Sequence, residues 1–220
     1  MPHIDSHIYC FAIRVIRMNI IIDAFLLLLD EGIMVCEPGC STGVLICYWA
    51  KRFPNSTFIG YDIDEKSVYK ARKRAKEENI TNVSFLVQDG CHLPSSWNRR
   101  FDLILSFLIV HDVPLAQSFL QGMKLSLKNG GCLIVVEARC KANLEDNKEI
   151  ATARETFGYS LFHCLPVSLH HKKSEGIGLA WGVEHVEKAL IDVGFKVVFI
   201  YECEDIFHPR AYFICLNSLK

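Results

Sequence analysis

The sequence predicts a doubly wound α/β fold, in which helices cover both faces of a mostly parallel sheet. From residue 33 onward, short apolar, β-branched runs alternate with longer amphipathic ones. A glycine-bearing turn follows the first of these runs, and the first three runs each end in or just before an acidic residue. The chain has 220 residues, half of them hydrophobic, which is enough for one full core.

The strands and helices can be placed from these runs in order along the chain. Strands are predicted at 33–37, 57–62, 83–87, 101–107, 132–138, 196–201 and 211–216. Helices are predicted at 44–53, 65–78, 114–127 and 182–193, the third of them ended by Asn129-Gly130-Gly131. A turn over 205–210, which contains Pro209, joins the last two strands, so we expect that pairing to be antiparallel.

Two segments stand apart from this alternation. Residues 139–181 are too long for a plain connection, and they predict a helical and loop cap inserted over the carboxyl edge of the sheet. Residues 1–32 predict an N-terminal helical segment ahead of the main domain, which spans 33–217. Charged residues interrupt the apolar run over 8–35, and its longest uncharged piece is shorter than the ~20 residues that a membrane span needs. A buried or docking helix is the expectation there.

The charge balance and the cysteines bear on partners and location. The chain has 24 Lys and Arg against 25 Asp and Glu, a net charge of -1, so we expect neither a nucleic acid nor a membrane as partner. Ten cysteines occur without a Cys-x-x-Cys pair and without a secretory leader, which predicts reduced thiols and a cytoplasmic location. The pair His170-His171 lacks further ligands at zinc spacing, so no metal site is predicted.

The turn after the first strand and the acids that follow it point to a nucleoside-like ligand. Glycines in such a turn let the backbone approach a ligand at the start of a helix. Asp62 lies 62 − 39 = 23 residues after Gly39, close to the ~20 expected for an acid that binds a ribose diol. Asp89 ends the third strand at the same edge of the sheet. A nicotinamide fingerprint would need glycines at 39, 41 and 44, and only Gly39 is present, which disfavours a nicotinamide-dependent oxidoreductase.

These motifs, from Glu37-x-Gly39-x-Ser41-x-Gly43 through Gly60-Tyr61-Asp62-Ile63 and Asp89 to Phe101–Ser106, resemble the class I S-adenosylmethionine-dependent methyltransferases. The resemblance implies a seven-stranded sheet with the last strand antiparallel, and S-adenosylmethionine as cofactor. It places Glu37 and the glycine turn around the amino-acid end of the cofactor, Asp62 on the ribose and Asp89 on the adenine amino group. The cofactor-binding residues so predicted are Glu37, Gly39, Cys40, Ser41, Gly43, Asp62, Ile63, Asp89, Gly90 and Phe107. Ser41 is more commonly glycine in that family, and serine, which is small, is tolerated there if its φ is negative.

A narrower resemblance covers residues 157–167, FGYSLFHCLPV, and Ala180-Trp181-Gly182. These residues resemble a branch of methyltransferases whose longer members carry an N-terminal winged-helix domain. Only about 32 residues precede the first predicted strand here, so that domain is expected to be absent.

The candidate catalytic residues are His111, Asp112 and His163. Imidazole titrates near neutrality, so His111 could take a proton from an acceptor, or it could cap a helix or pack on the cofactor. His163 could touch the acceptor or hold the backbone of the cap. The expected acceptor is a hydroxyl, thiol or amine of a small molecule, held under the cap by the apolar side chains of Phe157, Phe162, Leu165 and Trp181. A catalytically silent relative that binds cofactor or a protein partner is the alternative, and the oligomeric state is open.

Overall fold

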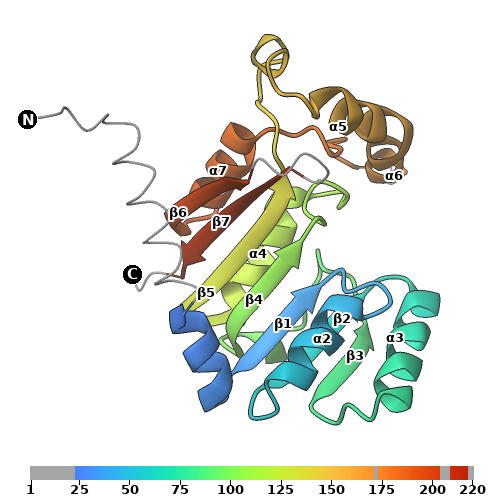
Figure 1. Ribbon diagram of the computed structural model, residues 1–220, viewed down its shortest axis with the longest axis vertical. Coiled ribbons are helices and arrows are strands. Elements are labelled where there is room, and N and C mark those ends of the chain that lie inside the picture. The colour runs from blue at the N-terminus through green and yellow to red at the C-terminus, as the bar shows by residue number, and fades with distance from the viewer. Residues whose placement is uncertain (1–22, 171–172, 204–208, 218–220) are drawn as a thin grey trace, which may run out of the picture.

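A computed structural model describes residues 23–170, 173–203 and 209–217. Its seven-stranded sheet has the strand order β3-β2-β1-β4-β5-β7-β6 (Figure 1). The strands are β1 (Met34–Pro38), β2 (Thr57–Asp62), β3 (Val83–Val87), β4 (Phe101–Phe107), β5 (Leu127–Ala138), β6 (Lys196–Cys203) and β7 (Arg210–Leu216). The helices of the main domain are α2 (Val44–Arg52), α3 (Glu65–Glu77), α4 (Ala116–Ser126) and α7 (Val183–Asp192), preceded by a helix over residues 23–31.

The pairing of the strands confirms the predicted fold class. Strands β1 to β5 pair in parallel, whereas β7 runs antiparallel to both β5 and β6. The order reverses between β1 and β4, and this switch point is where doubly wound sheets bind ligands.

One predicted boundary is wrong. The helix stop expected at Asn129-Gly130-Gly131 lies inside β5, because α4 already ends at Ser126 and the chain pairs with β4 at once. The pairing shifts register there, from Phe101 opposite Leu127 to Leu103 opposite Cys132. The glycines therefore serve a bulge in the strand rather than a helix end.

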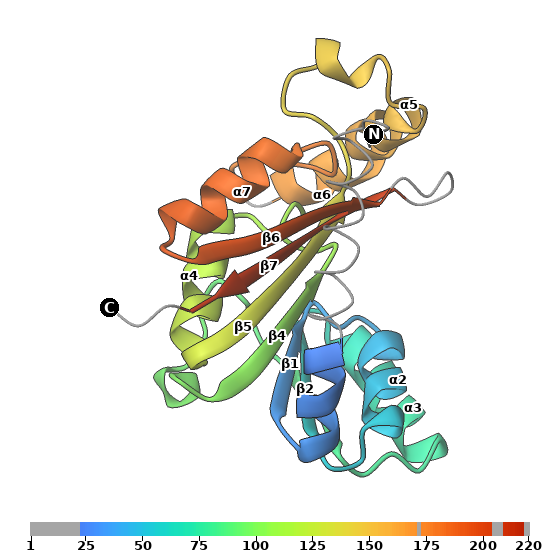
Figure 2. The same ribbon diagram turned by 60° about the vertical axis from the view of Figure 1, so that its left-hand side comes forward.

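Helices cover both faces of the sheet, and each face has its own apolar core. Helices α2 and α3 and the helix over 23–31 lie on one face, and α4 and α7 lie on the other (Figure 2). Val35 and Phe58 belong to the core of the first face, whereas Leu133 and Phe213 belong to the core of the second. These side chains are fully buried, as the apolar runs predict for strands covered on both sides.

The segment after β5 forms a helical layer beyond the carboxyl ends of β4 and β5 (Figure 1). It contains α5 (Ala153–Tyr159), a π-helix (Ser160–Cys164) and α6 (Leu165–Leu169). The division into an N-terminal segment, a main domain and a cap stays a prediction. Residues 1–22 and most of the predicted turn at 205–210 lie outside the described residues.

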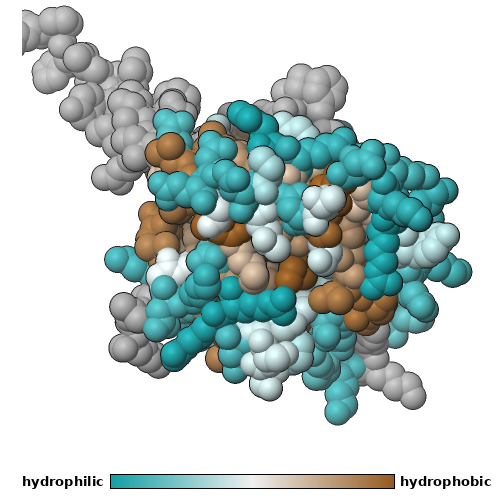
Figure 3. Space-filling view, turned by 90° about the horizontal axis from the view of Figure 1, so that it is seen from below, coloured by the Kyte–Doolittle hydropathy of each residue, from teal (hydrophilic) through white to brown (hydrophobic). Residues whose placement is uncertain are grey.

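The opposite end of the molecule, away from this layer, has mostly hydrophilic side chains around a smaller number of apolar ones (Figure 3). Among the described residues, no helix has the length and apolar character needed to cross a bilayer. The described cysteines are all free, and the cytoplasmic location stays a prediction.

Candidate active site

The turn between β1 and α2 is shaped for close approach by a ligand. The Cys40 amide donates to the Tyr61 carbonyl at 3.0 Å, which ties the turn to the end of β2. Gly39 has a φ of 63°, and a Cβ there would lie 2.6 Å from Cγ1 of Ile109. Gly43 has a φ of 72° at the start of α2. A Cβ at Gly43 would lie 2.9 Å from Cβ of Ala71, so both positions require glycine for conformation and for space.

The condition of a negative φ at Ser41 is not met, because the structure gives this residue a φ of 48°. Its amide donates a hydrogen bond of 2.8 Å to Oδ2 of Asp62, and this bond aligns the turn with the end of β2. Left-handed backbone costs an L-residue about 1–2 kcal/mol, so the turn holds Ser41 in a strained conformation.

The acids at the ends of β2 and β3 are both ordered by backbone amides. Oδ1 of Asp62 accepts a hydrogen bond of 2.9 Å from the amide of Asp64. Oδ1 of Asp89 accepts one of 2.9 Å from the amide of Cys91, and Oδ2 lies 2.7 Å from Nδ1 of His92. The two carboxylates are thus held in fixed directions before any ligand arrives.

A cavity of about 440 Å³ opens at this edge of the sheet. Five of the predicted cofactor residues line it, namely Gly39, Asp62, Ile63, Asp89 and Gly90. Sequence reasoning missed further lining residues, which are Tyr61, Gln88, Cys91, His92, Ile109, Val113, Pro114, Leu115, Phe119 and Lys173. Of these, Gln88, Cys91, His92 and Ile109 lie within five residues of the end of β3 or β4, and that position was the available signal.

Glu37 lies beneath the turn rather than on the cavity wall. It is buried, and its Oε2 has no hydrogen-bond partner. Burial raises the pKa of Glu37 to about 8, against a hydrogen bond from the Ile46 backbone that lowers it, and the charge of Asp62 raises it further. An unpaired buried carboxyl beside a glycine turn fits a ligand that brings a cationic amino group, as S-adenosylmethionine does.

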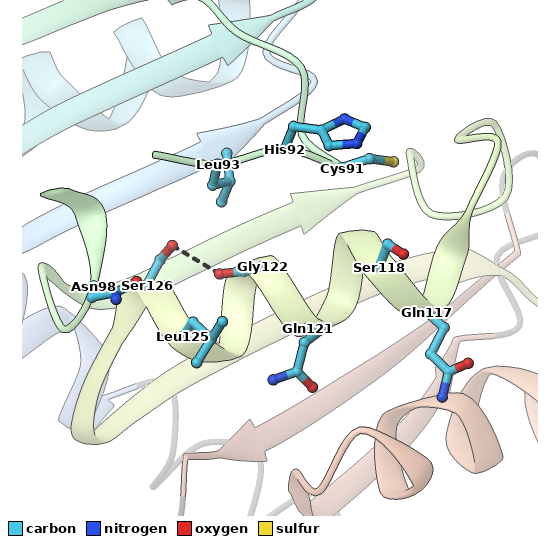
Figure 4. A pocket seen from close by; sticks show the side chains of 10 residues that line it. All are labelled: Cys91, His92, Leu93, Asn98, Gln117, Ser118, Gln121, Gly122, Leu125 and Ser126. Carbon is cyan, nitrogen blue, oxygen red and sulfur yellow. Dashed lines mark hydrogen bonds between the residues drawn. The ribbon is translucent and has the colours of Figure 1, made fainter. Parts of the chain in front are cut away.

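A second cavity, of about 480 Å³, adjoins the first and shares Cys91 and His92 with it (Figure 4). Its other wall is α4, which presents the polar side chains of Gln117, Ser118 and Gln121. The predicted cofactor-binding residues do not line this cavity, whereas five of them line the first, which is therefore named the cofactor cavity.

Phe107, predicted to bind cofactor, lines neither of these cavities. It lies on a separate apolar cavity of about 480 Å³, with Leu26 and Trp49 among the other lining residues. Successive strand residues point to opposite faces, and Phe107 points to the face of the helix over 23–31.

His111 sits in a buried ion pair that the sequence did not indicate. Its Nδ1 lies 2.5 Å from Oε2 of Glu137 on β5, and both side chains are 3% exposed or less. The other oxygen of Glu137 accepts a hydrogen bond of 3.0 Å from the amide of Val110. A lone acid inside the apolar run CLIVVEA was the signal that could have found Glu137.

This pairing changes the chemistry available to His111. Burial alone would lower the pKa of His111, but the charge of Glu137 and a hydrogen bond with Cys164 raise it to about 10. At neutral pH the ring is therefore an imidazolium, which donates hydrogen bonds and takes no proton. The role of general base proposed from the sequence does not fit this state of His111.

Asp112 and His163 are placed differently from each other. Oδ1 of Asp112 lies 3.4 Å from Nε2 of His111, and it has no hydrogen-bond partner. His163 is exposed on the π-helix, while its neighbour Cys164 is buried against the pair. The structure thus brings His111, Asp112 and Cys164 together and leaves His163 at the surface.

The four apolar residues expected to hold an acceptor do not gather around one cavity. Phe162 is 83% exposed, and Trp181 lines a cavity against α7 instead. Phe157 and Leu165 are half-buried. The apolar residues nearest the cofactor cavity are those of the segment after β4, especially Ile109, Val113 and Pro114.

The sheet order, the glycine turn and the strand-end acids together define a class I S-adenosylmethionine-dependent methyltransferase. Residues 29–177 match the family model described as a methyltransferase domain, so the chain belongs to that family and its cofactor is S-adenosylmethionine. Among solved structures, the fold is similar to that of a SAM-dependent methyltransferase from Aquifex aeolicus. That comparison has a TM-score of 0.65, 16% identity and coverage of 91% of this chain and 89% of that one.

Two curated relatives are similar over shorter stretches. A tRNA (guanine-N(7)-)-methyltransferase of Chloroflexus aggregans is 37% identical over 81 residues, 37% of this chain and 35% of that enzyme. A ubiquinone biosynthesis O-methyltransferase of Leptothrix cholodnii is 28% identical over 101 residues, 46% of this chain and 42% of that enzyme. The matched segment thus spans less than half the length of either relative.

The first of these relatives corrects one prediction. The near-neutral charge led us to expect no nucleic-acid partner, and the similarity to a tRNA methyltransferase contradicts that expectation. Net charge reports the average over the whole surface, and it does not register a local site for a charged substrate.

Proposed function

We propose that the protein transfers the methyl group of S-adenosylmethionine to a hydroxyl, thiol or amine of a small molecule. The observation that supports this best is the apolar wall of the cofactor cavity, formed by Ile109, Val113 and Pro114, with Ile109 packed against Gly39 of the glycine turn. Small-molecule sites are mostly apolar with a few polar anchors, and this wall matches that description. The O-methyltransferase relative acts, by its name, in the biosynthesis of a small molecule.

The bound cofactor supplies an electrophilic methyl group, and the residues of the chain bind and orient it. In this proposal Glu37 and the turn at Gly39–Gly43 hold the amino-acid end, Asp62 the ribose and Asp89 the adenine. Orientation and exclusion of water provide most of the rate in such a displacement. His111 then acts as a positioning group that ties the segment after β4 to β5 through Glu137. Asp112 and His163 are the residues proposed to meet the acceptor.

A second candidate acceptor is a guanine nitrogen of tRNA. The relative from Chloroflexus aggregans favours it, since that enzyme is named for this reaction. One experiment separates the two candidates: the purified protein is incubated with methyl-labelled S-adenosylmethionine and either unmodified tRNA or a panel of small hydroxyl, thiol and amine acceptors. Label in the small molecules supports the first candidate, and label in tRNA replaces it with the second. Cofactor binding without transfer to either would indicate the catalytically silent alternative.

Binding of the cofactor has its own test. Replacing Asp62 with alanine removes hydrogen bonds to the ribose, and bonds that involve a charged group contribute about 1.5–3 kcal/mol. We therefore expect Asp62→Ala to weaken S-adenosylmethionine binding roughly 10- to 150-fold in calorimetry. Asp64→Ala is the matched control, because Asp64 caps α3 beside the site without lining the cavity. Equal affinities for the two variants would refute the ribose assignment.

A further inference from the structure

His111, Asp112 and Cys164 form a cluster of donor atoms of the kinds that bind metal ions. Neither the sequence motifs nor the binding of the cofactor explains this cluster. One donor atom from each residue, a ring nitrogen, a carboxylate oxygen and a sulfur, lies within 4.8 Å of the other two. The three residues come from the segment after β4 and from the π-helix, so the fold alone brings them together. π-Helical turns are rare and occur frequently at functional sites.

The spacing of two of the donors matches tetrahedral coordination. Zinc binds nitrogen and oxygen ligands at about 2.0–2.2 Å, which puts neighbouring donors of a tetrahedron about 3.3–3.6 Å apart. Nε2 of His111 and Oδ1 of Asp112 are 3.4 Å apart. That oxygen of Asp112 is buried and has no hydrogen-bond partner, so it is available to an ion.

Glu137 provides the support that a metal-binding histidine needs. Metal-ligating histidines usually give their second ring N–H to a carboxylate, which fixes the ring and its tautomer. Here Oε2 of Glu137 lies 2.5 Å from Nδ1 of His111, and the Val110 amide holds the other oxygen of Glu137 at 3.0 Å. Nε2 is therefore directed at Asp112 and Cys164, in the position of the metal-binding nitrogen.

We propose that His111, Asp112 and Cys164 bind a divalent zinc-type ion, with Glu137 orienting His111 and a fourth position open to solvent or acceptor. The donor set of imidazole, carboxylate and thiolate is one that zinc accepts, and three protein ligands with an open position are typical of reactive zinc sites. His111 and Cys164 are nearly buried, whereas Asp112 is 28% exposed, so the open position lies on its side of the cluster. Binding displaces the protons of His111 Nε2 and of the Cys164 thiol to solvent.

The test is titration of the chelator-treated full chain with Co²⁺, read by the thiolate-to-cobalt absorption band, with bound metal measured by elemental analysis. We expect about one ion per chain, loss of the thiolate band in Cys164→Ser, and at least a tenfold weaker affinity in Asp112→Asn. Cys203→Ser is the matched control, since Cys203 is a half-buried free cysteine at the end of β6 outside the cluster, and it should behave as the wild type.

Absence of Co²⁺ binding in the wild type would overturn the proposal, and so would a thiolate band that survives in Cys164→Ser. Near-ultraviolet circular dichroism of each variant shows whether it folds. If Cys164→Ser does not fold, the absorption of Asp112→Asn decides, because its altered ligand field must differ from that of the wild type. The measurement involves neither S-adenosylmethionine nor methyl transfer. Its result is therefore independent of whether the proposed function is correct.

Discussion

At the scale of single residues, the site combines strain with an uncompensated buried acid. Ser41 adopts left-handed backbone where the fold favours glycine, and Glu37 holds an unpaired oxygen beneath the same turn. Both features cost stability in the free protein. Their position at the turn between β1 and α2 is what makes them functional candidates.

The strain at Ser41 predicts a stabilising substitution. Ser41→Gly removes the steric cost of the left-handed conformation, which is about 1–2 kcal/mol. Glycine has greater freedom in the unfolded chain, and this entropy offsets part of the gain. We expect a net gain of about 0.5–1 kcal/mol in the free energy of unfolding, measured by urea denaturation. Ser84→Gly, in the middle of β3, is the control and should lose stability. A loss in Ser41→Gly would show that the serine side chain matters more than its φ.

The raised pKa of Glu37 predicts how stability depends on pH. Burial raises this pKa from 4.5 to about 8, so between these values the folded protein keeps a proton that the unfolded chain has released. The free energy of unfolding therefore falls as pH rises through this window, by up to about 1.4 kcal/mol per pH unit. The thiol of Cys40, which interacts electrostatically with Glu37, stays protonated over the same pH range, because burial and the charges of Glu37 and Asp62 raise its pKa.

Glu37→Gln tests this dependence by removing the titrating group while keeping its shape. Thermal unfolding from pH 5 to 8 should show the variant gaining stability relative to the wild type as pH rises. Glu77→Gln, exposed on α3, should run parallel to the wild type. Parallel curves for Glu37→Gln as well would mean that Glu37 is ionised throughout.

At the scale of elements, α3 shows how local sequence positions the site. Asp64 caps this helix by accepting hydrogen bonds from the amides of Lys66 and Ser67, and its own amide donates to Asp62. The start of α3 and Asp62 are thus parts of one hydrogen-bonded turn. The carboxylate of Asp62 is oriented by the same residues that begin the helix.

Removing the cap should therefore affect stability more than binding. Asp64→Ala leaves the first amides of α3 without their acceptor, and such losses cost about 0.5–2 kcal/mol. Its backbone amide still donates to Asp62, so the affinity for S-adenosylmethionine should change less than threefold. Urea denaturation and calorimetry measure the two effects, and an intact stability would show that Asp64 does not act as a cap.

At the scale of the whole molecule, the question is what joins the helical layer after β5 to the sheet. The amide of Gly178 donates to the carbonyl of His111 at 3.1 Å, and the amide of Val183 donates to the carbonyl of Cys140 at 2.9 Å. The residue that accepts the first of these bonds, His111, also forms the buried pair with Glu137, which lies on β5 three residues before Cys140. Loss of this pair should loosen both the sheet edge and the layer above it.

Glu137→Ala would leave the His111 imidazolium buried without a counter-charge. Breaking a buried ion pair on one side typically costs about 3–5 kcal/mol, so we expect a loss of that order in urea denaturation. The control is Glu202→Ala, which breaks the more exposed pairing with Arg139 and should cost roughly 1 kcal/mol or less. Similar losses in the two variants would contradict the importance assigned to the buried pair.

The sequence by itself determined the α/β class, the near-complete set of strand limits and the acids at the strand ends. These follow from periodicity and from spacing within one strand-turn-helix unit, where neighbours in sequence are neighbours in space. Gly39, Asp62 and Asp89 were found on that basis, and each lines the cavity. The bulge at Asn129-Gly130-Gly131 was missed because glycine marks helix ends and strand irregularities alike.

Only the tertiary structure decided the partners of His111, the face of Phe107 and the φ of Ser41. Glu137 and Cys164 meet His111 across separate elements, and no local pattern reports which side chains the packing of a sheet and a helical layer will oppose. The pKa of His111 depends on that meeting, since desolvation and a nearby charge act through space. Contacts formed by folding, rather than residue types along the chain, therefore determine the chemistry of this edge of the sheet.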